Sequence, residues 1–184
     1  MNLLKLNRNY ANSFLDVCIQ EGNISAISEE VNLFIQMLEE NPQLSRVLEN
    51  PVIKPSQKLI ILKEIFGTSV TKRFWDFIDL IVLNHRSDIL KEVLKLFLKL
   101  RDERDGIAKV ELTVQYIPDA DQTERIRKSI EKLLSKKVVL DIKVDDTILG
   151  GFVARFEDKI IDGSLRHQLD KIKKLFLKTS IKFN

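Results

Sequence analysis

The stretch Asp105-Gly-Ile-Ala-Lys-Val-Glu-Leu-Thr-Val114 decides the fold, because the spacing of apolar residues changes within it. Val110, Leu112 and Val114 alternate with charged or polar residues, which is the pattern of a half-buried strand. Before Gly106, apolar residues recur every three or four positions, which indicates helices. The sequence therefore predicts a change from helical to mixed structure at Gly106, and an α+β fold.

Residues 1–105 are predicted to form about six helices joined by short connections. Pro42 suits the first position of a short helix, because that position needs no backbone N–H donor. Pro51 ends this helix, since the residue before a proline avoids the helical region, and Gly67 can cap the next helix. The apolar stripes of the helices include Tyr10, Ala11, Phe14, Ile27, Val31, Phe74, Ile78, Ile81, Val82, Val93 and Phe97. We expect a compact six-helix bundle.

Residues 106–184 are predicted to form a small mixed α/β domain. A helix follows the first strand, and Asp121 and Glu124 are spaced as in a capping box at its start. Apolar residues alternate again over residues 138–144, which predicts a second strand.

A hairpin and a final helix are expected at the end of this domain. The hairpin strands are predicted at 151–156 and 159–162. Asp162-Gly163-Ser164 offers side-chain oxygens that can cap the free N–H groups of the helix that follows. The apolar stripe of this helix is expected to consist of Leu165, Leu169, Ile172 and Phe176, with Lys171, Lys173, Lys174 and Lys178 largely off it.

Composition indicates an ordinary globular protein. Of 184 residues, 44% are hydrophobic and 31% charged. The single cysteine, Cys18, cannot form an internal disulfide, and nothing suggests an oxidising compartment. The longest apolar stretch, residues 74–83, contains Asp76 and Asp79 and is shorter than the about 20 residues that span a bilayer. We expect contact with a membrane only through partners.

No catalytic or metal site is expected. His85, His167 and one cysteine are too few ligands for a convincing metal site. Gly150-Gly151 precedes a predicted strand rather than a helix, so a tight turn explains it better than a phosphate cradle. The pair Asp145-Asp146 fits a solvated turn. We therefore expect neither a catalytic residue nor a cofactor.

The two regions differ in charge. Residues 1–105 carry 14 basic and 15 acidic side chains, and residues 106–184 carry 16 basic and 12 acidic ones. Such a difference fits two domains with separate partners. It also allows an alternative function, a cytosolic nucleic-acid-binding protein that uses the basic C-terminal half, although no aromatic residue alternates with the lysines of the final helix to stack on bases. A small transferase with an unrecognised site is a third alternative.

The segment from Thr147 to Leu169 carries a dense set of defined positions: Gly150-Gly151, Arg155, Asp158, Ile161, Asp162-Gly163-Ser164, Arg166 and Leu169. This segment resembles the C-terminal signature of the delta subunit of the F-type ATP synthase, a family similar to the mitochondrial oligomycin-sensitivity-conferring protein. Tyr10-Ala11, Asn50-Pro51 and the turn at residues 83–86 resemble other parts of the family more loosely.

The resemblance implies a non-catalytic stator subunit of the peripheral stalk. Such a subunit links the catalytic head to the membrane sector and resists rotor torque during ATP synthesis and hydrogen ion transport. It implies that residues 1–105 bind the N-terminus of the alpha subunit and residues 106–184 bind the C-terminal helices of the b subunits. The expected location is the cytoplasmic face of the cell membrane, with attachment through these partners.

The resemblance also implies roles for particular residues. In the family, the alpha-subunit helix docks between the first and fifth helices, which here carry Tyr10, Ala11 and Phe14, and Ile78, Ile81 and Val82. The residues of the C-terminal signature are expected to be structural, allowing close backbone packing and directing the final helix away from the sheet: Gly150, Gly151, Asp162, Gly163 and Ser164.

Overall fold

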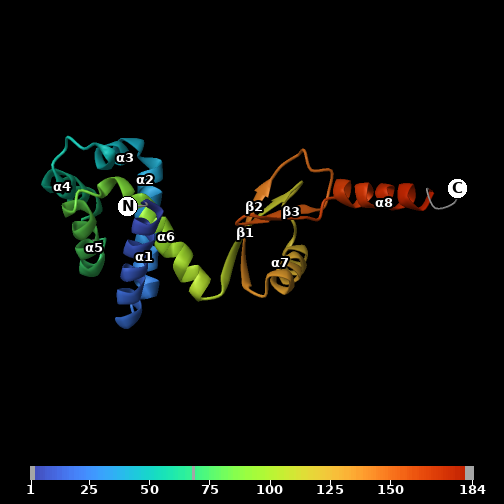
Figure 1. Ribbon diagram of the computed structural model, residues 1–184, viewed down its shortest axis with the longest axis horizontal. Helices are drawn as coiled ribbons and strands as arrows, with labels where there is room; N and C mark the ends of the chain where they lie inside the picture. Colours follow the sequence, from blue (N-terminus) through green and yellow to red (C-terminus); the bar gives the residue numbers. More distant parts are fainter. Residues whose placement is uncertain (1–2, 68, 181–184) are drawn as a thin grey trace. The chain divides into compact units, whose positions relative to one another are not determined.

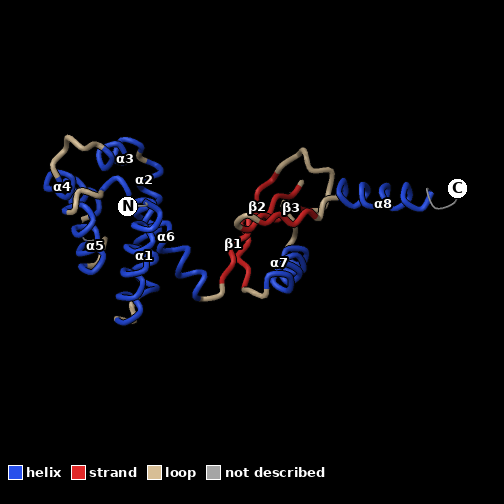
Figure 2. The backbone as a smooth tube through the Cα atoms, viewed as in Figure 1, coloured by secondary structure: helices blue, strands red, loops and turns tan. Residues whose placement is uncertain are grey.

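The computed structural model describes residues 3–67 and 69–180, without the side chains of residues 172 and 174–180. Eight α-helices and one four-stranded mixed sheet lie in this described part, so the predicted α+β class is confirmed. The chain divides into two compact units, Met1–Asp102 and Glu103–Asn184. The strands all belong to the second unit (Figures 1 and 2).

Helices make up the described N-terminal unit. In chain order they are α1 (Leu3–Gln20), α2 (Ile24–Glu40), α3 (Pro42–Glu49), α4 (Pro55–Phe66), α5 (Lys72–Leu83), the short 3-10 helix η1 (Ser87–Ile89) and α6 (Leu90–Arg104). Pro42 and Pro55 occupy the first positions of α3 and α4, where a missing N–H costs nothing. Gly67 ends α4 with a φ of 48° and a ψ of −126°, which lies outside the left-handed helical region predicted for a cap but is a conformation that glycine adopts readily.

One apolar cluster holds these helices together. Its centre is aromatic: the ring of Phe34 stacks on Phe66 with centroids 4.3 Å apart and meets Phe74 edge-on at 5.6 Å. Phe97 from α6 contacts Phe14 from α1 at 5.0 Å. Because aromatic pairs add about 0.5–1.5 kcal/mol beyond the area they bury, these rings are a main source of stability in the N-terminal unit.

The C-terminal unit is a sheet with strand order β2-β1-β3-β4. Its strands are β1 (Ile107–Val114), β2 (Lys137–Val144), β3 (Phe152–Phe156) and β4 (Lys159–Asp162), and its helices are α7 (Ala120–Leu134) and α8 (Leu165–Ser180). β1 and β2 are parallel, and α7 is the crossover between them; β3 and β4 are antiparallel. The predicted hairpin is therefore confirmed, with a turn in which Glu157 has a φ of 51°.

The helix α7 covers one face of this sheet (Figure 1). Ile130 from α7 is fully buried in a second apolar cluster with Ala108, Val110 and Leu112 of β1. The other face of β1 carries polar side chains, such as Glu111, whose carboxylate accepts a 2.6 Å hydrogen bond from Lys143 Nζ. The alternation read from the sequence thus separates a buried face from a solvated one.

The capping box predicted at Asp121 and Glu124 is wrong. The cap is Asp119, whose Oδ1 accepts from the Gln122 N–H at 2.7 Å while Gln122 Oε1 accepts from the Asp119 N–H at 3.3 Å. Asp121 lies inside the first turn and pairs with Arg125. Pro118 precedes the true cap and explains the shift, because it favours extended backbone just before itself and cannot donate an N–H.

Candidate functional site: a groove between α1 and α5

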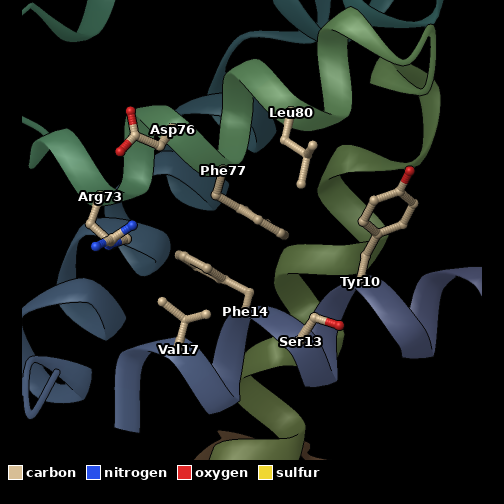
Figure 3. Close-up of a pocket in the computed structure, with 8 residues that line it drawn as sticks. All are labelled: Tyr10, Ser13, Phe14, Val17, Arg73, Asp76, Phe77 and Leu80. Carbon is tan, nitrogen blue, oxygen red and sulfur yellow. The ribbon is translucent and has the colours of Figure 1, made fainter. Parts of the chain in front are cut away.

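An apolar groove of about 220 Å³ lies between α1 and α5. Eight residues line it: Tyr10, Ser13, Phe14 and Val17 from α1, and Arg73, Asp76, Phe77 and Leu80 from α5. In Figure 3, Val17 and Arg73 lie at one end of the groove, and Tyr10 and Leu80 lie at the other. The two helices therefore run antiparallel along it.

Two stacked rings form the floor. Phe14 and Phe77 face each other with centroids 3.9 Å apart and an interplanar angle of 5° (Figure 3). Both side chains are almost fully buried, at 4% and 6% exposed, yet both contribute to the wall of the groove. A floor of close-packed rings is rigid, so the groove is formed before any partner arrives.

The walls are amphipathic. Tyr10 and Val17 are half-buried, and Leu80 is 51% exposed although it is apolar. Arg73 stands at one end, where its guanidinium forms an ion pair with Glu21 and its Nε donates to Glu21 Oε2 at 2.8 Å. Hydrogen bonding to Arg73 lowers the pKa of Glu21, and the same contact raises the pKa of Arg73. The pair fixes Arg73 at the boundary of the groove.

The residues that the resemblance assigned to docking fall into two groups. Tyr10 and Phe14 line the groove. Ala11, Ile78, Ile81 and Val82 are at most 1% exposed and fill the core beneath it.

Sequence reasoning missed three apolar lining residues, Val17, Phe77 and Leu80. Leu80 carried a usable signal, because it lies three residues after Phe77 and falls outside the stripe formed by Ile78, Ile81 and Val82.

The described side chains offer no arrangement typical of catalysis. No group of three or more His, Cys, Asp or Glu residues that could hold a metal lies among them. Asp145 Oδ1 accepts from the backbone N–H and the hydroxyl of Thr147, and these bonds lower the pKa of Asp145. His85 is exposed in a turn with a φ of 56°, and His167 Nδ1 lies 3.8 Å from Asp162 Oδ2. These contacts stabilise turns.

The C-terminal unit presents a second apolar cavity, of about 510 Å³, at the end of the sheet where α8 begins. Tyr116, Leu149 and Leu165 line it and are 64%, 68% and 48% exposed. Leu169, one turn further along α8, is 65% exposed. Of the stripe predicted on this helix, the side chains of Ile172 and Phe176 lie outside the described residues. The two members of this stripe whose side chains are described, Leu165 and Leu169, are thus exposed and open to a partner.

The signature residues build the junction between the sheet and α8. The backbone N–H of Leu165 donates to the carbonyl of Gly150 at 3.0 Å, and that of Gly163 donates to Phe152 at 2.9 Å. Asp162 Oδ1 accepts from the Ser164 N–H at 2.9 Å, and hydrogen bonding to the side chain and the backbone of Ser164 lowers the pKa of Asp162. The buried Ser164 accepts from the His167 N–H through its Oγ at 3.2 Å and so caps α8.

A side chain at Gly151 would not fit this junction. Gly151 has a φ of +79°, and a Cβ there would lie 2.3 Å from the carbonyl oxygen of Gly163. Close backbone approach therefore requires glycine at this position.

Known proteins resemble this chain over nearly its whole length. The family model described as ATP synthase delta (OSCP) subunit matches residues 6–176. The ATP synthase subunit delta of Carboxydothermus hydrogenoformans is 30% identical, over 95% of this chain and 98% of its own length. That of Geotalea uraniireducens is also 30% identical, over 97% of this chain and 99% of its own.

A solved structure shares the fold. A chain in the cryo-EM structure of the Toxoplasma gondii mitochondrial ATP synthase hexamer superposes with a TM-score of 0.70. It is 16% identical, and the match covers 94% of this chain and 97% of that one. None of these comparisons supports the nucleic-acid-binding alternative.

None of the helices in the described residues combines the length and the apolar character needed to cross a bilayer. The family that matches this chain associates with the membrane through the ATP synthase complex. With the family match over most of its length, the chain belongs to the ATP synthase delta (OSCP) subunit family and is a non-catalytic peripheral-stalk subunit of an F-type ATP synthase.

Proposed function

We propose that this subunit holds the catalytic head through the groove between α1 and α5, which receives an amphipathic helix from the N-terminus of the alpha subunit. The observation that carries the proposal is the preformed apolar floor of Phe14 and Phe77, open along one side of the helical unit. A helix laid in a groove uses a few apolar anchors at spacings of three and four residues. Tyr10, Val17 and Leu80 are placed to contact such anchors.

The size of the groove favours a helix over a small molecule. Its volume of about 220 Å³ is below the range of about 300–1,000 Å³ that is typical of ligand pockets. Its lining combines apolar side chains with the hydroxyls of Tyr10 and Ser13 and with two charged groups at one end. Side-chain anchors of a helix need only shallow sites of this kind, because the rest of the helix rests on the rims.

We infer that the C-terminal unit binds the C-terminal helices of the b subunits. Support comes from the exposed apolar residues Leu165 and Leu169 on α8 and from the adjoining cavity with Tyr116 and Leu149. Lys171 and Lys173 are exposed on the same helix. Basic side chains beside an apolar stripe speed the association of an acidic rod and make it sensitive to salt.

The two surfaces together explain how one small chain can resist torque. The head would turn with the rotor unless it were held, so the link must stay bound rather than react. Once one surface is bound, binding at the other becomes intramolecular, which can raise avidity by about 10²–10⁴ over either contact alone. We propose that the six N-terminal helices act as one bundle in this link, and that the protein lies at the cytoplasmic face of the cell membrane.

The groove is tested with Leu80→Asp. Leu80 lines the groove but is 51% exposed, so a charge there spares the core. We expect at least a tenfold loss of affinity for a synthetic peptide of the alpha-subunit N-terminus, measured by calorimetry, because a docked helix would remove water from a carboxylate at residue 80 that has no partner in the apolar contact.

Leu33→Asp is the matched control. Leu33 is 57% exposed on α2 and does not line the groove, so this variant should bind the peptide normally. Tyr10→Ala should also lower the affinity for the peptide, as Leu80→Asp does. Equal affinity of the wild type, Leu80→Asp and Tyr10→Ala would remove the groove from the function.

A further inference from the structure

We propose that Asp76 is a specificity residue of the groove, and that it pairs with a basic side chain next to the apolar anchors of the docked helix. This inference rests on the proposed function. Asp76 lines the groove, is exposed, and lies on α5 directly before the floor residue Phe77 and one turn before Leu80. The carboxylate of Asp76 therefore lies next to Phe77 and Leu80, the apolar residues of α5 that a docked helix would contact.

The neighbouring charges leave Asp76 available for a partner. Arg73, the other charged lining residue, is held by two hydrogen bonds to Glu21. Asp79, the other carboxylate of α5, lies 3.8 Å from Lys63 Nζ. Among the described residues, the carboxylate of Asp76 has no hydrogen bond or ion pair, although its charge contributes to raising the pKa of Arg73.

Docking of a helix would change the surroundings of this carboxylate. An apolar helix face laid over Phe77 and Leu80 removes water from one side of Asp76, and removal of water strengthens the attraction of a close opposite charge. It also penalises a partner that leaves the carboxylate unpaired or places an acid opposite it. Asp76 therefore selects a helix with a Lys or Arg beside its apolar stripe, at the end of the groove that holds Arg73 and Val17.

The test is a charge swap in the full chain. The probe is a synthetic peptide of the alpha-subunit N-terminus, and the variants are Asp76→Asn and Asp76→Lys. We expect about a threefold loss of affinity for Asp76→Asn and a loss of about tenfold for Asp76→Lys, the range of partly exposed to partly desolvated pairs. Among peptides with single Lys or Arg to Glu changes, one should recover affinity with Asp76→Lys and lose it with the wild type.

Asp16→Lys is the matched control. Asp16 is exposed on α1 outside the groove, and its replacement by Lys changes the net charge by the same amount as Asp76→Lys. The Asp16→Lys variant should therefore bind the original peptide normally and should not restore the affinity of any variant peptide. If the wild type binds the peptide, Leu80→Asp does not, and Asp76→Lys binds as tightly as the wild type, the role of Asp76 is wrong while the groove stands. If the wild type does not bind at all, the proposed function itself fails.

Discussion

Lys58 shows how much a single residue contributes to this fold. Its side chain is 5% exposed, and its Nζ donates to the carbonyl of Leu48 at 2.7 Å and to Ser87 Oγ at 2.8 Å. Ser87 Oγ donates in turn to the same carbonyl at 2.7 Å. Burial lowers the pKa of Lys58, and the charge of Asp88 opposes this shift. The three groups connect the end of α3, the first turn of α4 and η1.

Ser87→Ala should destabilise the N-terminal unit by about 1–3 kcal/mol, because it removes two buried hydrogen bonds, one of them with the charged ammonium of Lys58. Lys58 would lose an acceptor, and the Leu48 carbonyl would lose a donor. Trp75, the single tryptophan, lies on α5 and reports on this unit in a urea titration followed by fluorescence. Ser13→Ala, at an exposed position of α1, should change the midpoint little. A shift for Ser87→Ala no larger than this control would contradict the network.

Cys18 should be almost inert in the folded protein. Its side chain is 0% exposed, and burial, assisted by the charge of Glu21, raises the pKa of the thiol from about 9 to about 12. Since only the thiolate reacts, folding lowers the reactive fraction at pH 8 by about a thousandfold, in addition to blocking access. Ellman's reagent should therefore label Cys18 at once in denaturant and only through rare opening in buffer. Comparable rates in both conditions would be incompatible with this burial.

At the scale of elements, sequence periodicity predicted most of the helices and strands because each has one buried face. The hairpin at residues 151–162 and the helix starts at Pro42 and Pro55 follow from local backbone preferences. The cap of α7 was misplaced, because Asp119 and Asp121 are both good caps and only the neighbouring backbone decides between them.

The groove was harder to predict than the elements. Periodicity shows which residues are apolar, but it does not show whether a helix face meets core or solvent. Ile81 and Leu80 are both apolar neighbours on α5, yet one is fully buried and the other is half exposed. That difference depends on how α1 and α5 pack together, which is a property of the tertiary structure.

Gly151→Ala should destabilise the junction between β3 and α8. The new Cβ would meet two backbone groups, Gly163 O at 2.3 Å and Ser164 Cα at 3.0 Å, at a φ of +79°. Backbone must move to relieve this contact, so we expect a loss above about 2 kcal/mol. Gly106→Ala is the control in the same unit, because its φ is also positive, at +65°, but nothing lies within 4 Å, which leaves a strain of about 1 kcal/mol.

Amide hydrogen exchange is the measurement for this pair. Protection of β3 and β4 should fall more in Gly151→Ala than in Gly106→Ala, while the Trp75 midpoint of the N-terminal unit stays the same in both. Equal protection in the two variants would mean that the junction tolerates a side chain at residue 151.

At the scale of the whole molecule, the chain has two separate hydrophobic cores. Among the residues that the structure describes, the buried apolar side chains of each unit form their own cluster, and neither cluster contains a residue of the other unit. The boundary between the units falls in the last turn of α6, which ends at Arg104, and β1 begins at Ile107. Each unit can therefore keep its core when the other is changed, which suits a link whose two ends hold different partners.

Because the two cores are separate, truncation after Asp105 can test the two proposed surfaces independently. The shortened chain keeps α1 to α6, the Phe14–Phe77 floor and the whole first cluster, so it should bind the alpha-subunit peptide with the affinity of the full chain. It lacks the cavity beside Leu165 and the exposed residues of α8, so it should lose the b subunit. Pull-down with the two partners in turn measures both outcomes.

In membranes, the truncated subunit should leave the head free to turn with the rotor. ATP hydrolysis would continue, because the catalytic sites lie on the head, but proton pumping driven by hydrolysis and ATP synthesis driven by a proton gradient should both fall to near background. The full chain with Leu33→Asp serves as the coupled control, since this change lies outside both proposed surfaces. Normal coupled synthesis by the truncated subunit would show that the N-terminal unit alone carries the torque and that the proposed division of labour is mistaken.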